Sequence, residues 1–236
     1  MTVLSMSMTF LTGFTQAPDP SPEVVVAHRS PGRVGGPRRS PEGVDHALSE
    51  SRPGSAKARI MVAADRLFYG EGIHTVGVQR VIEESEVTRV TFYRHFPSKD
   101  DLVLAYLARR AERARAAVTT LIAAHPGDPR GALHAWAVAF VNDGVIDEYR
   151  GCTFVNAAAE YAEPDHPVRV RAIEQRRWIN QVTEDLVRQV GHPDPRAATR
   201  ELLALRTGYV YSVGLEEPQG WEADFLAAHD RIVDGR

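Results

Sequence analysis

The chain has 236 residues, is 43% hydrophobic and carries a net charge of −3 with histidine neutral. This apolar content suffices for one or two folded domains. The slightly acidic balance excludes a globally basic nucleic-acid binder, so any DNA contact must come from a local patch. The single cysteine, Cys152, excludes an internal disulfide and a multi-cysteine zinc site.

Residues 1–53 are predicted to form a disordered extension. The opening MTVLSMSMTFLTGF has no basic residue before it and falls short of the ~20 apolar residues that span a membrane. From about Gln16 to Pro53 the sequence is rich in Pro, Gly, Ser and Arg, and it cannot bury enough apolar area to offset the entropy of ordering. We therefore expect no membrane segment, and a soluble, cytoplasmic protein.

After Pro53 the apolar residues recur with helical spacing almost to the end of the chain. A stripe over residues 60–68 predicts a first helix that ends near Gly72. Ser98 is a good N-cap, and two acidic residues follow it in the first turn of a long helix. The first helix is expected to end at Gly70 to Gly72, and the next three helices are expected at 77–84, 87–96 and 99–124.

The second half is divided by Pro and Gly clusters into five further helices. We expect them at 129–146, 151–162, 167–190, 197–215 and 221–233. Nothing resembles alternating strands. The predicted fold is all-α with about nine helices: a helix-turn-helix domain over 54–100, followed by a helical bundle over 101–236.

The segment VTRVTFYRHFPSK, residues 87–99, combines apolar anchors with a polar outer face. Phe92 and Phe96 lie four residues apart and share one helix face, and Val90 is a further candidate for the inner face. The outer face would carry Arg, Thr, Tyr and His, which are partners for phosphates and base edges. The alternative is a solvated helix surface. The outward residues are Thr88, Arg89, Thr91, Tyr93, Arg94 and His95.

The surrounding residues decide in favour of DNA binding. ARIMVAADRLFYGEGI and VQRVIEESEVTRVTFYRHFPSKDDLVLAYL together resemble the N-terminal domain of TetR-family transcriptional regulators. The resemblance covers about fifty residues, Lys57 to Leu107. In the first helix, the family pattern has an internal Ala-Ala, a terminal Leu-Phe and a Gly after the helix. Its recognition helix ends in Tyr-x-His-Phe and is followed by x-Ser-Lys-(Asp/Glu)-x-Leu. These positions are Ala63, Ala64, Leu67, Phe68, Gly72, Tyr93, His95, Phe96, Ser98, Lys99, Asp100 and Leu102.

The resemblance implies that the third helix enters the major groove of double-stranded DNA. Base contacts then fall to Thr88, Arg89 and Thr91, because arginine pairs bidentately with guanine and threonine offers a hydroxyl and a methyl group. Phosphate contacts fall to Tyr93, His95 and Lys99, and Arg94 suits either role. Lys99 also begins the fourth helix, whose free N–H groups favour an anion.

Three departures from the family pattern precede the recognition helix. Val76-Gly77 replaces the usual Thr/Ser pair, so the capping and phosphate-binding hydroxyl is absent at Gly77, and Thr75 is a stand-in. Ile82 replaces the common alanine of the second helix, and its larger side chain requires looser packing around that helix. Glu86 replaces the turn glycine and would be strained in a left-handed conformation.

The second half is similar, less specifically, to the family's ligand-binding and dimerisation domain, through the segment RGCTFVN at 150–156. Aromatic and amide side chains around the bundle interior are candidates for a pocket lining, and the alternative is ordinary core. Cys152 is either a buried structural cysteine or a redox sensor. The pocket candidates are Trp136, Phe140, Phe154, Asn156, Tyr161 and Trp178, with His134 and Gln181 as further polar groups.

Dimerisation is assigned to the predicted helix 197–215, where Gly208 and Gly214 permit close approach of a partner helix. A dimer also follows from operator geometry, because one recognition helix reads only a half-site, and the operator is then palindromic. The alternative is that this is a core helix of the protomer. The interface candidates, at helical spacing, are Leu202, Leu205, Tyr209 and Val213.

These features predict a dimeric, ligand-responsive regulator, and most simply a repressor that releases its operator when an unknown small molecule fills the bundle. The alternatives are an architectural DNA-binding protein without an effector and a helical-bundle enzyme. No nucleophile–base or metal constellation has fitting spacing. We therefore expect no catalytic residue, no cofactor and no metal.

Overall fold

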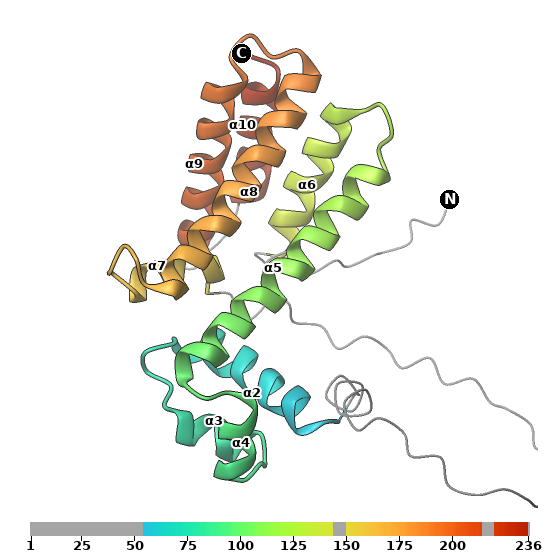
Figure 1. Ribbon diagram of the computed structural model, residues 1–236. Coiled ribbons are helices and arrows are strands. Elements are labelled where there is room, and N and C mark those ends of the chain that lie inside the picture. The colour runs from blue at the N-terminus through green and yellow to red at the C-terminus, as the bar shows by residue number, and fades with distance from the viewer. Residues whose placement is uncertain (1–53, 144–149, 214–219, 236) are drawn as a thin grey trace, which may run out of the picture.

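The computed structural model describes residues 54–143, 150–213 and 220–235, and within these residues every regular element is a helix (Figure 1). This confirms the predicted all-α fold. The predicted extension 1–53 lies outside the described residues. None of the described helices is long and apolar enough to cross a bilayer. The helices are α2 (Ala56–Glu71), α3 (Val78–Glu84), α4 (Arg89–His95), α5 (Lys99–Ala123), α6 (Pro129–Asp143), α7 (Thr153–Glu160), α8 (Pro167–Val190), α9 (Pro195–Val213) and α10 (Trp221–Val233).

Local capping explains most helix boundaries. α5 begins with a capping box in which the Ser98 hydroxyl accepts from the Asp101 N–H at 3.1 Å and the Asp101 carboxylate accepts from the Ser98 N–H at 3.0 Å. α8 begins at Pro167 and is terminated after Val190 by its C-cap Gly191, which has the left-handed φ of 85° that favours glycine. α7 is shorter than predicted at both ends, and the expected extensions of α6 and α9 fall outside the described residues.

α2 packs against α5, and α3 and α4 pack against α2; α5 then continues into the bundle (Figure 1). There α5 contacts α6 and α8, and α9 and α10 complete the bundle. α7 lies between the two parts of the molecule (Figure 1). A single apolar core runs through α2, α3, α4, the start of α5, α7 and the start of α8. The helix-turn-helix therefore shares its core with α7.

Two more apolar clusters fill the bundle. One surrounds Trp136, Leu186 and Leu202, and the other surrounds Phe140 and Phe225. In the second, the Phe140 and Phe225 ring centroids are 5.7 Å apart, a favourable aromatic spacing. Together the clusters hold α6, α8, α9 and α10 at the separation that shapes the bundle cavity.

Candidate nucleic-acid interface and bundle cavity

α4 presents one apolar face to the core and a polar face to solvent. Phe92 is fully buried and Phe96 is 4% exposed, so the predicted anchors are confirmed. The Thr88 hydroxyl caps the helix by accepting from the Thr91 N–H at 3.2 Å. Thr88, Arg89 and Arg94 are exposed, and Thr91 and His95 are half-buried at the edge of the same face.

Val90 does not turn inward as the sequence suggested, since 81% of its surface is exposed. It lies two residues before Phe92, and about 200° of helical rotation therefore points it away from the core. An apolar side chain among polar neighbours on this face can contact a thymine methyl group. Val90 is thus a candidate base contact that sequence reasoning missed, and helical geometry alone could have revealed it.

Arg89 and Tyr93 form a pair on the exposed side of α4. The Arg89 guanidinium carbon lies 5.6 Å from the Tyr93 ring centroid, and the two residues are one helical turn apart. Tyr93 is 39% exposed, and its ring also packs edge-on against Phe92 at 5.3 Å. The buried phenylalanine therefore orients the tyrosine, and the tyrosine orients the arginine.

The turn before α4 is held in a left-handed conformation. Glu86 has a φ of 51°, and no other described non-glycine residue has a positive φ. The Arg59 side chain of α2 fixes the turn, since its Nε donates to the Ser85 carbonyl oxygen at 3.1 Å. The strain expected for a residue other than glycine at Glu86 is therefore present.

Replacing Glu86 with glycine is expected to raise the free energy of unfolding by about 0.5–1 kcal/mol, because relief of the left-handed strain exceeds the entropic cost of glycine. The Glu86 side chain is exposed, so little contact is lost. Urea denaturation measures the change. The matched control is Glu83→Gly in α3, which should destabilise by about 1 kcal/mol. Equal destabilisation by both substitutions would contradict the assigned strain.

Two predicted phosphate contacts lie near the α2–α3 turn. Gly77 is the N-cap of α3 and no side chain caps this helix, so Thr75 does not supply the missing cap. The Lys99 Nζ donates to the His74 carbonyl oxygen at 3.5 Å. Burial lowers the pKa of Lys99, and the nearby Glu160 and Asp100 carboxylates oppose that shift.

A buried ion pair connects α2 to α5. Arg110 donates from Nε and Nη2 to the two carboxylate oxygens of Asp65, at 2.9 and 3.0 Å. Its Nη1 donates to the Thr153 hydroxyl of α7 at 3.1 Å, and the guanidinium lies over the rings of Tyr69 and Tyr106. Neither side chain of the pair is more than 9% exposed. One arginine thus joins three helices, a network that the sequence did not predict.

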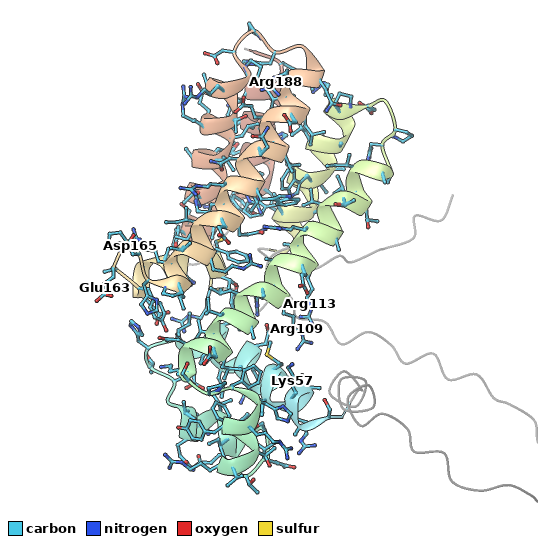
Figure 2. All side chains as sticks on the ribbon, in the orientation of Figure 1. Lys57, Arg109, Arg113, Glu163, Asp165 and Arg188 are labelled. Atoms are coloured by element: carbon cyan, nitrogen blue, oxygen red, sulfur yellow. The ribbon has the colours of Figure 1, made fainter. Side chains whose placement is uncertain are left out.

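The other end of α7 contacts the helix-turn-helix part directly. The Glu160 carboxylate accepts from the N–H groups of Ile73 and His74 at 3.0 and 2.5 Å. The Tyr161 hydroxyl donates to Asp100 at 3.0 Å, and burial together with this carboxylate raises the Tyr161 pKa. Tyr161 therefore lies against the start of α5 rather than in the bundle cavity. Beyond it, Glu163 and Asp165 extend outward from the α7–α8 connection (Figure 2).

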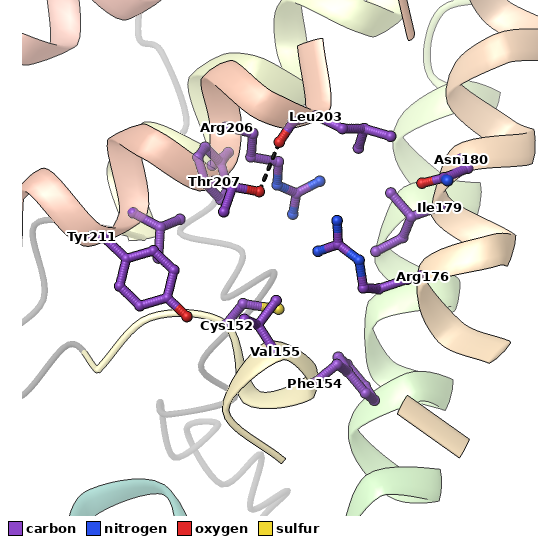
Figure 3. A pocket seen from close by; sticks show the side chains of 12 residues that line it. Cys152, Phe154, Val155, Arg176, Ile179, Asn180, Leu203, Arg206, Thr207 and Tyr211 are labelled. Carbon is purple, nitrogen blue, oxygen red and sulfur yellow. Dashed lines mark hydrogen bonds between the residues drawn. The ribbon is translucent and has the colours of Figure 1, made fainter. Parts of the chain in front are cut away.

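A cavity lies between α6, α7, α8 and α9 (Figure 3). A neighbouring space shares Phe140, Leu203 and Arg206 with it. The lining combines apolar side chains with two guanidinium groups. It consists of Phe140, Cys152, Phe154, Val155, Arg176, Ile179, Asn180, Leu203, Arg206, Thr207, Val210 and Tyr211.

The structure brings only some of the predicted pocket residues together. Phe140 and Phe154 line this cavity, and Trp136 lines the neighbouring space. Asn156 sits beside the cavity and accepts from the Tyr211 hydroxyl at 3.3 Å. Trp178 instead packs under the Arg115 guanidinium at 5.3 Å.

The polar groups of the cavity differ from those expected. His134 pairs with Asp230 at 3.1 Å, and Gln181 donates to Asp185 at 3.0 Å, so both side chains are engaged elsewhere. The polar side chains that line the cavity include Arg176 and Arg206 instead. Sequence reasoning missed them because solvated helix faces and cavity walls both contain arginine. Cys152 is half-buried and lines the cavity.

Most of the α9 residues considered for dimerisation contribute to the core of the protomer. Leu202 is 6% exposed and Tyr209 is 4% exposed, and Leu205 packs against the cluster around Phe140. These side chains therefore pack inside the protomer, in agreement with the alternative that this helix is a core helix. The Val213 side chain lies outside the described part of the chain. The face of α9 that remains exposed carries Ala204, Gly208 and Tyr211.

Comparisons with known proteins agree with this architecture. The family of bacterial regulatory proteins, tetR family, matches residues 60–106, from α2 to the first turns of α5. The HTH-type transcriptional regulator LmrA of Bacillus subtilis is 26% identical over 146 residues, which is 61% of this chain and 77% of LmrA. The HTH-type transcriptional activator FasR of Mycolicibacterium smegmatis is 30% identical over 56 residues, 24% of this chain and 26% of FasR.

A solved structure extends the likeness to the bundle. The chain is 40% identical in sequence to a TetR-family transcriptional regulator from Streptomyces coelicolor whose crystal structure is known. The two structures align with a TM-score of 0.72, over 76% of this chain and 94% of that chain. Each of these relatives is a transcriptional regulator, and none is named as an enzyme. Sequence and structure thus agree over both the helix-turn-helix and the bundle, and the chain belongs to the TetR family of transcriptional regulators.

Proposed function

We propose that this DNA-binding regulator is a dimeric, cytoplasmic repressor that releases a palindromic operator when a small molecule fills the bundle cavity. Residues 54–100 form its DNA-binding part, and residues 101–236 form its effector-binding and dimerisation part. The observation that carries this proposal is that α7 belongs to both parts. It forms a wall of the cavity, its Thr153 end holds Arg110, which pairs with Asp65 of α2, and its Glu160 end contacts the α2–α3 turn directly.

Neighbouring residues of α7 face opposite ways. Phe154 and Val155 line the cavity, whereas Thr153 accepts from the buried Arg110. At the other end of the helix, Glu160 holds the α2–α3 turn. A ligand that shifts α7 must therefore rearrange the contacts that orient α2 and α3. Its effect on DNA affinity is limited by its differential affinity for the two conformations.

On DNA, α4 would occupy the major groove. Thr88, Arg89 and Thr91 remain the proposed base contacts, with Val90 added for a thymine methyl. Tyr93, Arg94, His95 and Lys99 are the proposed phosphate contacts, together with the backbone at Gly77. Two such helices in a dimer read half-sites about one helical turn apart, roughly 34–36 Å.

We place the dimer contact on the exposed face of α9. Replacing Gly208 with arginine is expected to convert the dimer to a monomer and to weaken operator binding at least about tenfold, because a long cation blocks close helix approach and is desolvated without a partner. A Cβ at Gly208 meets no atom within 4 Å in the protomer, so the fold should be preserved. Light scattering after size exclusion measures the mass.

The control is Ala116→Arg, which places the same side chain on the exposed side of α5. A G208R protein that stays dimeric would contradict the interface on α9.

The proposed function is tested by selecting bound DNA from random fragments with the full chain and then footprinting the selected sites. We expect a palindrome with two protected half-sites. Ligands found by thermal shift are then added to the complex, and at least one should release the DNA. Thr153→Val should keep DNA binding but weaken this response, because it removes the hydroxyl that links α7 to Arg110. A complex that no cavity ligand dissociates would favour the architectural alternative.

A further inference from the structure

A buried histidine of α10 lines the space beside the bundle cavity. This space lies between α6, α8, α9 and α10 and shares Phe140 with the cavity. His229 is only 7% exposed, and it lines the space together with Thr183 of α8. Buried polar atoms are normally hydrogen-bonded, so the polar atoms that face an open space define what that space binds. The protonation of the His229 ring therefore decides the chemistry of this site.

Asp230 fixes which nitrogen of His229 carries the proton. The Asp230 Oδ1 lies 3.2 Å from the Nδ1 of His229 and 3.1 Å from the Nδ1 of His134. Burial opposes ionisation of Asp230, but its hydrogen bonds with His134 and His229 hold its pKa below the usual value. An ionised carboxylate only accepts hydrogen bonds, so the His229 Nδ1 carries the proton and donates it.

The His229 ring is neutral at neutral pH. Burial lowers its pKa, although the hydrogen bond and charge of Asp230 oppose that shift. A neutral imidazole that is protonated at Nδ1 has a lone pair at Nε2. This Nε2 forms no hydrogen bond within the described residues, since the hydrogen bond of the ring runs through Nδ1. His229 therefore offers the space an acceptor.

The second polar side chain of the site is also an acceptor. The Thr183 hydroxyl donates to the Ile179 carbonyl oxygen at 2.9 Å, so only the lone pairs of its oxygen remain for a ligand. Arg206 lines the space too, but other contacts already hold it, among them the Phe140 ring, whose centroid lies 4.3 Å from the guanidinium carbon. The hydrogen-bond donor must therefore come from the ligand.

The walls of the space are mainly aromatic and aliphatic. Trp136, Phe140 and Phe225 line it, and the ring centroids of Phe225 and His229 are 6.3 Å apart. No aspartate or glutamate is found among the described residues of the lining. Aromatic walls favour offset or edge-on contact with another aromatic ring. A neutral ring thus fits this space better than a cation does.

We infer that this space binds a neutral aromatic compound with a hydroxyl group, which donates its hydrogen bond to the His229 Nε2. The ring of the ligand packs against Trp136 and Phe225. That this ligand acts as the effector rests on the proposed function. A second hydroxyl group on the same ring would find an acceptor in Thr183. An isosteric compound without a donor leaves Nε2 buried without a partner, and a polar site rejects such an analogue.

Ligand-observed NMR titration of the full chain tests this preference with probes of nearly equal shape. The probes are phenol against fluorobenzene, and 2-naphthol against 2-fluoronaphthalene, because fluorine has almost the size of a hydroxyl group but donates no hydrogen bond. We expect at least one hydroxyl probe to bind about three- to tenfold more tightly than its fluoro analogue, the ratio expected for one hydrogen bond. Fluoro probes that bind as tightly on both bodies, or hydroxyl probes that do not bind, would overturn the inference.

Substitution of the histidine assigns the preference to one side chain. His229→Phe keeps an aromatic ring but removes Nε2, so the hydroxyl and fluoro probes should bind with nearly equal affinity. The matched control is His134→Phe, because His134 contacts the same Asp230 oxygen but does not line the space. This control should retain the wild-type preference. A preference that survives in H229F, or is lost equally in H134F, would contradict a site at His229.

The unaltered protein gives a further test that does not depend on the folding of a variant. The nitrogen NMR shifts of a histidine ring distinguish a protonated from an unprotonated nitrogen. At neutral pH, His229 should show a protonated Nδ1 and an unprotonated Nε2, and phenol should shift the Nε2 signal more than the Nδ1 signal. A proton on Nε2 in the unliganded protein would overturn the inference.

The outcomes also separate this inference from the proposed function. Probe binding is measured without DNA, and operator release is measured afterwards on the same preparations. A hydroxyl probe that binds with the expected preference but leaves the operator bound would uphold the ligand class and contradict the release mechanism. A protein that binds its operator but shows no preference for the hydroxyl probes would overturn the ligand class alone.

Discussion

Replacing Asp65 with asparagine is expected to lower the free energy of unfolding by about 3–5 kcal/mol, the loss typical when one partner of a buried ion pair is removed. Arg110 is 4% exposed as a residue and donates two hydrogen bonds to the Asp65 carboxylate. Asparagine cannot neutralise the guanidinium, which would remain charged in a site that water does not reach. Urea denaturation followed by circular dichroism measures the change.

The exposed ion pairs of Arg188, at the far end of the bundle, provide the control (Figure 2). Arg188→Ala should cost less than about 1 kcal/mol, because solvent screens such pairs. The double replacement of Asp65 and Arg110 by Leu and Met should recover much of the loss, since no charge is then left buried. A D65N protein no less stable than R188A would show that the pair does not stabilise the fold.

The same substitution should also weaken operator binding beyond its effect on stability. Asp65 belongs to α2, and α2 carries Arg59, which fixes the turn before α4. A protein in which α2 can shift relative to α5 holds its recognition helix less firmly, and part of the binding free energy is then spent on ordering it. Anisotropy measured at a temperature where D65N remains folded separates this effect from unfolding.

The double substitution Arg89→Ala with Tyr93→Ala is expected to weaken binding to the selected operator by about thirtyfold or more, because a bidentate arginine–guanine pair alone contributes about 1–3 kcal/mol. Both side chains are exposed on α4, so the protein should stay folded, and its melting temperature checks this. Fluorescence anisotropy against operator and random DNA gives the two affinities.

The single substitutions divide the two roles. Arg89→Ala should relax specificity, with a larger loss on the operator than on random DNA, whereas Tyr93→Ala should weaken both and reduce the salt dependence only slightly. Their effects should not add, since the two side chains are in contact at 5.6 Å. Arg177→Ala, on an exposed face of α8, should bind DNA as the wild type does. If R89A/Y93A also binds as tightly as the wild type, α4 is not the recognition helix.

Much of the DNA-binding part could be predicted because its signals are local. The spacing of Phe92 and Phe96 fixed which side of α4 is buried. Ser98 and Asp101 form a capping box within four residues, and Glu86 stands where the turn requires a left-handed residue. Each of these features depends on neighbours along the chain, so the sequence alone determined the helix, its orientation and its strained turn.

Only the tertiary structure decided how distant helices converge. Asp65 and Arg110 are 45 residues apart, and Arg110 and Thr153 are 43 apart, so no local pattern pairs them. The apolar stripe of α9 is equally compatible with a core and an interface, and packing assigned Leu202 and Tyr209 to the core. Arg176 and Arg206 came to line one cavity only through the angle and rotation at which α8 and α9 pack. Helical periodicity specifies which residues share a face, whereas the partner of that face depends on contacts that close long loops.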